Sequence, residues 1–263
     1  MNDGADKMKI AIAIPCYNCE VQIRRLLFEL DKVLTNQKLI SEVYLIENNS
    51  TDATLAEAIR TVAELPSKKY FSVYRNPKNI GLGGTHKIAF TVAKSNMMTH
   101  LILLHGDHQA TANDIPLIIE YLHRKNGVNI LGSRFLNLRN LSGYSFLRKS
   151  GNLALNRVYS VVTNVQVMDL GSGLNAFRLA DFDPEVYQNF DDGFTFNMDL
   201  LLYLIGKKIA FKYVPIKWTT VDQISNARAL SVGLKTLIKL FRWRFSLPNE
   251  NEKHFESEKL SID

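Results

Sequence analysis

The 263-residue sequence predicts an α/β protein in which a mostly parallel sheet is covered by helices on both faces. Three observations predict this class. Short apolar runs typical of buried strands alternate with segments of helical apolar spacing. The composition, 46% hydrophobic and 22% charged, is ordinary for a globular protein. No apolar run approaches the roughly 20 residues that a membrane-spanning helix needs.

The first half of the chain contains the most regular part of this pattern. The predicted elements are, in order, a strand over 9–15, a helix over 21–34, a strand over 42–47, a helix over 52–65, a strand over 70–75, a glycine turn at 81–84, a helix over 85–95 and a strand over 100–105. The polar residues 48–52 are of types that cap helices, so they start the second helix. Because ligands of parallel sheets bind at the carboxyl ends of the strands, we expect function in the loops that follow them.

The second half is less regular and contains no internal repeat or low-complexity linker. Helices are predicted over 113–125, 150–162 and 196–205, and strands over 128–133, 173–178 and 209–218. The simplest interpretation is one domain over residues 7–225, followed by a basic amphipathic helix over 226–247 and a flexible acidic tail over 248–263.

The net charge of +6 has a local origin. The basic residues between Asn226 and Phe245 are Arg228, Lys235, Lys239, Arg242 and Arg244, and no acidic residue lies among them. This excess indicates an anionic partner, such as phosphate groups, nucleic acid or acidic lipid. The basic residues lack the aromatic interleaving of a single-strand platform, and no helix-turn-helix spacing is present, so we expect no nucleic-acid partner.

The same C-terminal helix has an apolar face, formed by Leu230, Leu234, Leu237, Ile238, Phe241 and Phe245. Such a helix can lie in a membrane interface, which predicts a peripheral membrane contact. The alternative is a helix that packs on the sheet and leaves its basic face in solvent. The polar segment Met1–Lys9 and the apolar run after it make a poor signal peptide, so we expect a cytoplasmic protein that contacts, at most, the inner face of the cell membrane.

Two cysteines, Cys16 and Cys19, exclude a disulfide framework and a four-thiolate zinc site. They form a C-x-x-C at a strand-to-helix turn, where a thioredoxin-like redox pair would lie. The chain is too long for that fold and the parallel pattern continues far beyond it. We therefore expect two ordinary thiols.

The segment His105-Gly-Asp-His-Gln109 follows an apolar strand and carries ligand-type side chains at alternating positions. His105, Asp107 and Gln109 can point the same way from an extended segment. Oxygen ligands suit Mg²⁺ or Mn²⁺, and a nitrogen ligand favours Mn²⁺. The segment therefore predicts a metal site, with a polar loop and an incidental aspartate as the alternative.

Motifs follow the strands in a fixed order. In the first half these are Pro15-Cys-Tyr-Asn18, Glu47-Asn-Asn-Ser-Thr-Asp52, Arg75-Asn-Pro-Lys-Asn-Ile-Gly81 and the Asp107 loop. In the second half these are Gly132-Ser-Arg134, Asp169-Leu-Gly-Ser-Gly173, Phe196-Asn-Met-Asp199 and Val214-Pro-Ile216. Together they resemble the family 2 inverting glycosyltransferases with the GT-A fold. The resemblance covers residues 9–218 and is closest to the polyprenyl-phosphate sugar synthases, of the dolichol-phosphate-mannose type.

The resemblance implies a Rossmann-like GT-A domain and metal-dependent, inverting transfer of a sugar from a nucleoside-diphosphate donor. It implies Mg²⁺ or Mn²⁺ at His105, Asp107 and Gln109, with His105 in place of the family's first Asp. The implied donor-binding residues are Pro15, Tyr17, Glu20, Glu47, Asn49, Gly83, Gly106, Arg148 and Lys149. The implied catalytic residues are Arg134, Asp169 and Asp199.

The acceptor decides whether a general base is needed. A sugar hydroxyl requires Asp169 or Asp199 within hydrogen-bond reach, whereas a lipid phosphate is already anionic near pH 7. We expect a polyprenyl-phosphate acceptor. The alternatives are a sugar hydroxyl of a surface polysaccharide or lipid-linked glycan, and a catalytically silent nucleotide-sugar-binding protein, since His105 and Glu47 depart from the family pattern. Structural roles also remain open: a solvated helix start for Arg148 and Lys149, a turn for Asp169 and local pairing for Asp199.

Overall fold

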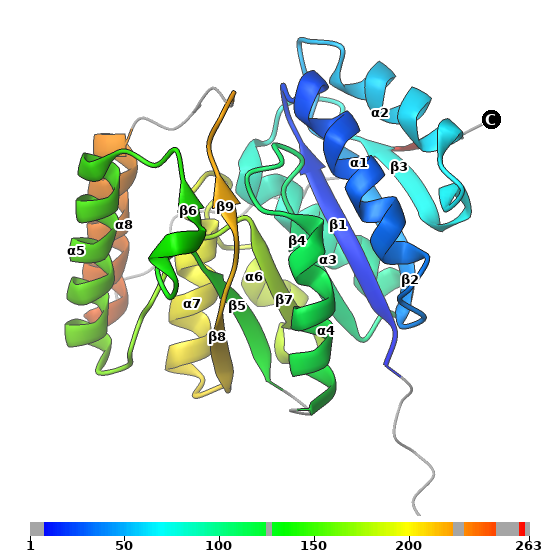
Figure 1. Ribbon diagram of the computed structural model, residues 1–263. Helices are drawn as coiled ribbons and strands as arrows, with labels where there is room; N and C mark the ends of the chain where they lie inside the picture. The colour runs from blue at the N-terminus through cyan, green and yellow to red at the C-terminus, as the bar shows by residue number, and fades with distance from the viewer. Residues whose placement is uncertain (1–7, 125–127, 223–228, 246–257, 261–263) are drawn as a thin grey trace, which may run out of the picture.

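The computed structural model describes residues 8–124, 128–222, 229–245 and 258–260 (Figure 1). Its centre is an eight-stranded sheet with the strand order β10-β3-β2-β1-β4-β7-β5-β8. The strands are β1 (Ile10–Cys16), β2 (Ile40–Glu47), β3 (Phe71–Arg75), β4 (His100–Leu104), β5 (Asn129–Ser133), β7 (Leu174–Arg178), β8 (Phe211–Pro215) and β10 (Glu258–Leu260). Neighbours pair in parallel except that β7 is antiparallel to β4 and β5, and β10 is antiparallel to β3. The predicted fold class is confirmed.

Helices cover both faces of this sheet. The helices are α1 (Glu20–Leu34), α2 (Thr54–Glu64), α3 (Gly81–Ser95), α4 (Ile115–Arg124), α5 (Phe146–Thr163), α6 (Pro184–Tyr187), α7 (Phe196–Gly206) and α8 (Ala229–Arg244). Short 3-10 turns occupy Lys68–Tyr70, Ala112–Asp114, Leu138–Asn140 and Leu179–Asp181. None of the helices in the described part of the chain is long and apolar enough to cross a membrane.

The two faces of β1 contribute to two separate cores, because successive side chains of a strand point to opposite faces. Ile12 and Ile14 pack with α1 and α4 in one core. Ala11 and Ala13 face the other core, which contains α3, α7 and buried side chains of α5 and α8. The sheet is thus buried on both faces, and its loops at the carboxyl end of β1, β2 and β4 are left to form a site.

Several element boundaries differ from the sequence prediction, and three of the differences have a clear local reason. The glycine turn predicted at 81–84 is the first turn of α3, where Gly81 has a φ of +79°. Helix α5 begins at Phe146, because the Ser145 hydroxyl accepts a hydrogen bond from the Arg148 backbone N–H. The single strand predicted over 209–218 is two strands: β8 ends at Pro215, which has no N–H for the ladder, and β9 (Trp218–Thr219) pairs with β6 (Leu141–Ser142).

Part of the predicted flexible tail is a strand. Residues Glu258–Leu260 form β10, which pairs with Val73–Arg75 and covers the open edge of β3. The prediction of flexibility does not hold for these three residues, because an edge strand offers unpaired backbone groups that a passing segment can satisfy. The rest of the tail lies outside the described residues, as do the predicted domain boundaries near residues 7 and 225.

Candidate active site

The loops after β1 and β2 are joined by hydrogen bonds between polar side chains and backbone. Asn18 donates its backbone N–H to the Ser50 hydroxyl (3.1 Å), and its side-chain oxygen accepts from the Thr51 backbone N–H (2.9 Å). Asn18 and Asn49 have φ values of 48° and 55°, a left-handed conformation that asparagine tolerates better than most residues. The polar residues after these two strands therefore form one fixed surface.

Glu47 ends β2 with its side chain only 1% exposed. Its Oε1 accepts from the Ser50 backbone N–H at 2.5 Å, and its Oε2 lies 3.5 Å from Nε of Arg75. Within the described residues Oε2 accepts no hydrogen bond. Glu47 is thus a buried carboxylate that fixes the loop after β2 and faces Arg75. Arg75 also donates to the side chain of Asn49 (3.4 Å), which links Asn49 to this carboxylate.

The three predicted donor-binding residues between the end of β1 and the start of α1 lie in different surroundings. Pro15 is buried and Tyr17 is half-buried, so the tyrosine ring retains an accessible surface. Glu20 is exposed, and its Oε2 accepts from the Ala53 backbone N–H (2.9 Å). Glu20 therefore holds the start of α2 against α1.

The predicted glycines are sites of close backbone approach. Gly106 donates its N–H to the carbonyl oxygen of Pro15 (3.0 Å), and an added Cβ would lie 2.8 Å from Sγ of Cys16. At Gly83 an added Cβ would collide with the carbonyl oxygen of Asp191. Both glycines are thus required by packing, whatever else they contact. Cys16 and Cys19 are free buried thiols, and burial raises the pKa of Cys16 well above its usual value.

His105 is turned toward helix α3. Its Nε2 lies 3.1 Å from Nε2 of His86, whose side chain is fully buried, and the backbone of Gly173 packs against its ring. Burial lowers the pKa of both imidazoles. The nearby His105 lowers the pKa of His86 further, whereas Asp107 raises and Arg134 lowers the pKa of His105. Both rings are therefore neutral near pH 7, and this nitrogen of His105 is engaged with His86 rather than with the Asp107 loop.

Asp107 and Gln109 lie on the loop that follows β4. The Oδ1 of Asp107 accepts from the Gln109 backbone N–H (3.2 Å), and the Gln109 amide donates to the Thr220 hydroxyl (3.1 Å). Among the residues that the structure describes, no three His, Cys, Asp or Glu side chains are grouped as a metal site. One carboxylate and one amide fit a Mg²⁺ or Mn²⁺ ion that takes its other oxygen ligands from a bound diphosphate and water.

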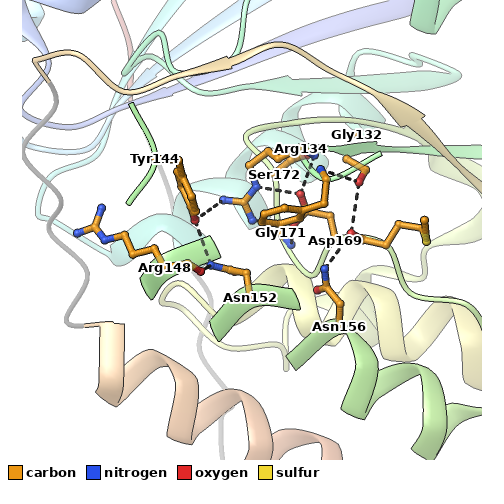
Figure 2. A network of polar contacts seen from close by, with 12 residues as sticks. Gly132, Arg134, Tyr144, Arg148, Asn152, Asn156, Asp169, Gly171 and Ser172 are labelled. Carbon is orange, nitrogen blue, oxygen red and sulfur yellow. Dashed lines mark hydrogen bonds and ion pairs between the residues drawn. The ribbon is translucent and has the colours of Figure 1, made fainter. Parts of the chain in front are cut away.

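Arg134 and Asp169, predicted as separate catalytic residues, form one buried ion pair (Figure 2). The guanidinium donates from Nε to Oδ2 (2.8 Å) and from a terminal nitrogen to Oδ1 (2.6 Å). The Arg134 backbone N–H also donates to Oδ2 (2.9 Å), and the Gly171 N–H donates to Oδ1 (3.1 Å). Burial alone would lower the pKa of Arg134, but the Asp169 carboxylate outweighs it and raises that pKa. Asp169 is fully used as a partner of Arg134.

Aromatic side chains surround this pair. The guanidinium of Arg134 lies 5.0 Å from the ring of Trp218 and donates to the Tyr144 hydroxyl (3.4 Å). Figure 2 shows that Arg148, by contrast, extends away from the pair. Arg148 is exposed and Lys149 half-buried at the start of α5, so the structure does not bring them to Arg134.

Asp199, the other candidate base, is also paired with a cation. Its Oδ2 accepts from Nζ of Lys239 on α8 (2.7 Å) and from the Asp191 backbone N–H (2.7 Å). Burial raises the pKa of Asp199, and Lys239 opposes this shift. The carboxylate therefore anchors α8 to α7.

Sequence reasoning missed two buried polar residues on α3. Lys87 is fully buried, with its Nζ 2.6 Å from Oδ1 of Asp192 and 2.7 Å from the carbonyl oxygen of Gln188. His86 holds His105, as described above. The available signal was a His-Lys pair at the start of an otherwise apolar helix, which indicates polar partners elsewhere in the chain.

The fold is similar to that of solved structures. The structure matches that of glucosyl-3-phosphoglycerate synthase from Mycobacterium tuberculosis in complex with Mn²⁺, UDP and phosphoglyceric acid, with a TM-score of 0.66 and 12% identity, over 97% of this chain and 88% of that one. At this identity the match defines the fold alone. The fold is therefore of the GT-A type.

The family follows from the sequence comparisons. The model of glycosyl transferase family 2 matches residues 11–182, and the chain belongs to this family. The undecaprenyl-phosphate 4-deoxy-4-formamido-L-arabinose transferase of Aeromonas hydrophila is 27% identical over 67% of this chain and 51% of its own length. The dolichol-phosphate mannosyltransferase of Pyrococcus furiosus is 30% identical over 54% of this chain. The chain spans 38% of the latter protein, so it matches about half or less of these two relatives.

Proposed function

We propose that this glycosyltransferase moves a sugar, with inversion, from a nucleoside-diphosphate donor to a polyprenyl phosphate. The relatives named above carry undecaprenyl phosphate and dolichol phosphate in their names, which supports this acceptor class. The observation that carries the proposal is the pairing of both candidate bases with cations, Asp169 with Arg134 and Asp199 with Lys239. The carboxylate oxygens that these cations hold are already engaged as hydrogen-bond acceptors, and an ionised phosphate needs no base.

In this proposal the carboxyl-end loops bind the donor. Glu47 accepts from the base, Tyr17 packs on it, and Pro15, Asn49, Gly83 and Gly106 shape the surface beneath. Arg148 and Lys149 at the start of α5 are left for the phosphate of the acceptor or donor, because Arg134 is already neutralised by Asp169. Arg134 then acts as a positioning residue that holds Tyr144 and Trp218 in place. Glu20 acts in the same indirect way, because it accepts a hydrogen bond from the backbone just before α2.

The cation of this proposal is Mg²⁺ or Mn²⁺, held by Asp107 and Gln109. Such an ion, when bound, stabilises the negative charge of the departing diphosphate. The Mn²⁺ and UDP of the solved glucosyl-3-phosphoglycerate synthase support this assignment. His105 is proposed as a support of the loop rather than as a ligand, because its ring nitrogen meets His86.

The donor half of the proposal is tested by thermal shift. Bound ligand stabilises the native state according to its affinity, so the melting temperature should rise with one of the UDP-, GDP- or dTDP-sugars in the presence of Mg²⁺ or Mn²⁺. No rise with any donor at millimolar concentration would contradict donor binding.

The variant Asp199→Asn tests whether sugar transfer proceeds without a general base. This variant keeps an oxygen that can accept a hydrogen bond from Lys239. We expect turnover with a polyprenyl-phosphate acceptor to fall by less than about tenfold. A general base contributes about 10²–10⁴-fold, so a loss of that size at unchanged melting temperature would make Asp199 the base and favour a sugar-hydroxyl acceptor. Binding without any turnover would favour a catalytically silent protein.

A further inference from the structure

Helix α8 packs on the domain through the side opposite to its apolar face. Thr236 and Leu240 are buried, the Tyr159 hydroxyl donates to the Thr236 carbonyl (2.7 Å), and Lys239 reaches Asp199. The apolar residues predicted to share a face are exposed: Leu234, Leu237, Ile238, Phe241 and Phe245, with Leu234, Phe241 and Phe245 near 60% exposure. A helix of a globular protein normally buries such a stripe. Helix α8 does pack on the domain, as the alternative in the sequence analysis proposed, but it leaves its apolar side in solvent.

Helix α5 exposes apolar residues beside α8. Phe146 and Leu147 are 84% and 83% exposed, and Val161 is 66% exposed. Leu147, Val158 and Val161 lie at spacings that align them along one side of the helix. The two helices pack against each other at the end of the molecule away from α2 (Figure 1). The α5–α8 face is defined here as the exposed apolar residues Phe146, Leu147, Leu153, Val158, Val161, Leu234, Leu237, Ile238, Phe241 and Phe245.

The charged residues of α5 and α8 have one sign. Neither α5 nor α8 contains an acidic residue. Their basic residues are Arg148, Lys149, Arg157, Lys235, Lys239, Arg242 and Arg244, of which Lys239 is held by Asp199 on the packed side. Two copies of the chain joined through this face would bring like charges together, which disfavours a symmetric dimer. A partner with an anionic surface over an apolar layer matches both features, because its charges can pair with the basic side chains and its apolar layer can bury the exposed apolar residues.

We propose that the α5–α8 face docks on the surface of a bilayer that contains anionic phospholipids. The apolar side chains enter the boundary between headgroups and acyl chains, and the basic side chains other than Lys239 meet lipid phosphates. The inference rests on the proposed function, since a membrane-embedded acceptor is what this face would serve. Ser145, which caps α5, directly follows Tyr144, whose hydroxyl contacts Arg134. The docked face therefore begins beside the candidate active site.

Co-sedimentation of the full chain with vesicles tests this surface without any sugar nucleotide. We expect binding to vesicles of phosphatidylcholine mixed with phosphatidylglycerol and much weaker binding to phosphatidylcholine alone. The variant Leu237→Gln with Phe241→Gln should bind at least about tenfold more weakly, because two apolar groups no longer leave water. The variant Lys235→Gln with Arg244→Gln should lose about fivefold for each charge removed.

The matched control replaces exposed apolar residues on other elements, Met97→Gln with Leu117→Gln, and should bind as the unchanged chain does. Each variant is first compared by melting temperature. Absence of binding to anionic vesicles, or equal binding by the Leu237→Gln, Phe241→Gln variant, would overturn the proposal. So would a dimer in sedimentation that this variant dissociates, since a second copy would then cover the face.

A water-soluble, short-chain polyprenyl phosphate separates this inference from the proposed function. If docking is correct, the Leu237→Gln, Phe241→Gln variant transfers sugar to the soluble acceptor at the unchanged rate while its binding to vesicles is lost. If the proposed function fails, no variant transfers sugar to the soluble acceptor, and vesicle binding still reports on the face.

Discussion

At the scale of single residues, the Arg134–Asp169 pair is the most demanding feature of the site. Both side chains are nearly fully buried, and the carboxylate meets the guanidinium through two hydrogen bonds. Asp169→Asn should destabilise the protein by about 3–5 kcal/mol, because it leaves a buried guanidinium without a counter-charge. Urea unfolding measures this loss.

The surface pair formed by Arg60 and Glu57 on α2 provides the matched control. Arg60→Gln should lower the free energy of unfolding far less than Asp169→Asn does, since exposed ion pairs contribute little. Equal effects of Asp169→Asn and Arg60→Gln would mean that the Arg134–Asp169 pair is open to water. Replacement of both partners, Arg134→Met with Asp169→Leu, should recover stability relative to Asp169→Asn.

The two neighbours His105 and Asp107 should respond differently to substitution. Asp107→Asn should weaken Mn²⁺-dependent binding of a nucleoside diphosphate by at least about tenfold, because the one carboxylate of the proposed cation site is lost. His105→Asn should change that binding by less than about threefold, since its ring nitrogen meets His86. Isothermal titration with and without Mn²⁺ distinguishes the two. The reverse order of effects would restore His105 as a ligand.

At the scale of elements, the N-terminus of α3 depends on the absence of a side chain at Gly83. An added Cβ there would collide with the carbonyl of Asp191, in the loop that also receives Lys87. Gly83→Ala should therefore cost about 1–3 kcal/mol by overpacking. Thermal unfolding followed by circular dichroism measures the change.

Gly151 in α5 is the matched control, because nothing lies within 4 Å of an added Cβ. Gly151→Ala should stabilise the protein by up to about 1 kcal/mol through helix propensity. A Gly83→Ala protein as stable as the Gly151→Ala protein would show that the loop at Asp191 moves away at no cost.

Element types were predictable where one local pattern decides them. The alternating side chains of β1 and the polar loop after it identify a buried strand that leads to a site. Strand β10 was not predictable, because its partner β3 lies far away in the sequence and only tertiary structure brings the two together. The break between β8 and β9 has a local cause in Pro215, which could have been recognised.

Candidate residues were predictable as types, and their partners were not. The sequence identifies Asp169 and Asp199 as candidate catalytic carboxylates, because both lie in motifs that resemble those of the glycosyltransferase family. Their cations lie 35 and 40 residues away, and no periodicity connects them. The same holds for His86 and His105. Charged and polar residues that the motifs suggest for catalysis are thus partly used to hold the fold together, which only the packed structure reveals.

At the scale of the whole molecule, three imidazoles whose pKa is lowered by burial make stability depend on pH. Burial lowers the pKa of His86 well below the ordinary value of 6.5, and it lowers the pKa values of His100 and His105 below that value. Below pH 6.5 the unfolded chain therefore binds protons that the folded chain does not. Stability should fall as pH decreases, by at most about 1.4 kcal/mol per pH unit for each imidazole, until its folded-state pKa is reached. Urea unfolding between pH 7.5 and 5.5 checks the sign, and His100→Asn should reduce the slope. A slope of opposite sign would mean that these rings take up protons within the fold.

The measurement that tests the central claim most directly is sugar transfer to two matched acceptors. The acceptors are a short-chain polyprenyl phosphate and the polyprenol of the same length, each incubated with the donor that stabilises the protein and with Mn²⁺. We predict a glycosylated product from the phosphate and none from the alcohol. Transfer to a free hydroxyl, of the polyprenol or of an added glycan, with none to the phosphate would contradict the account.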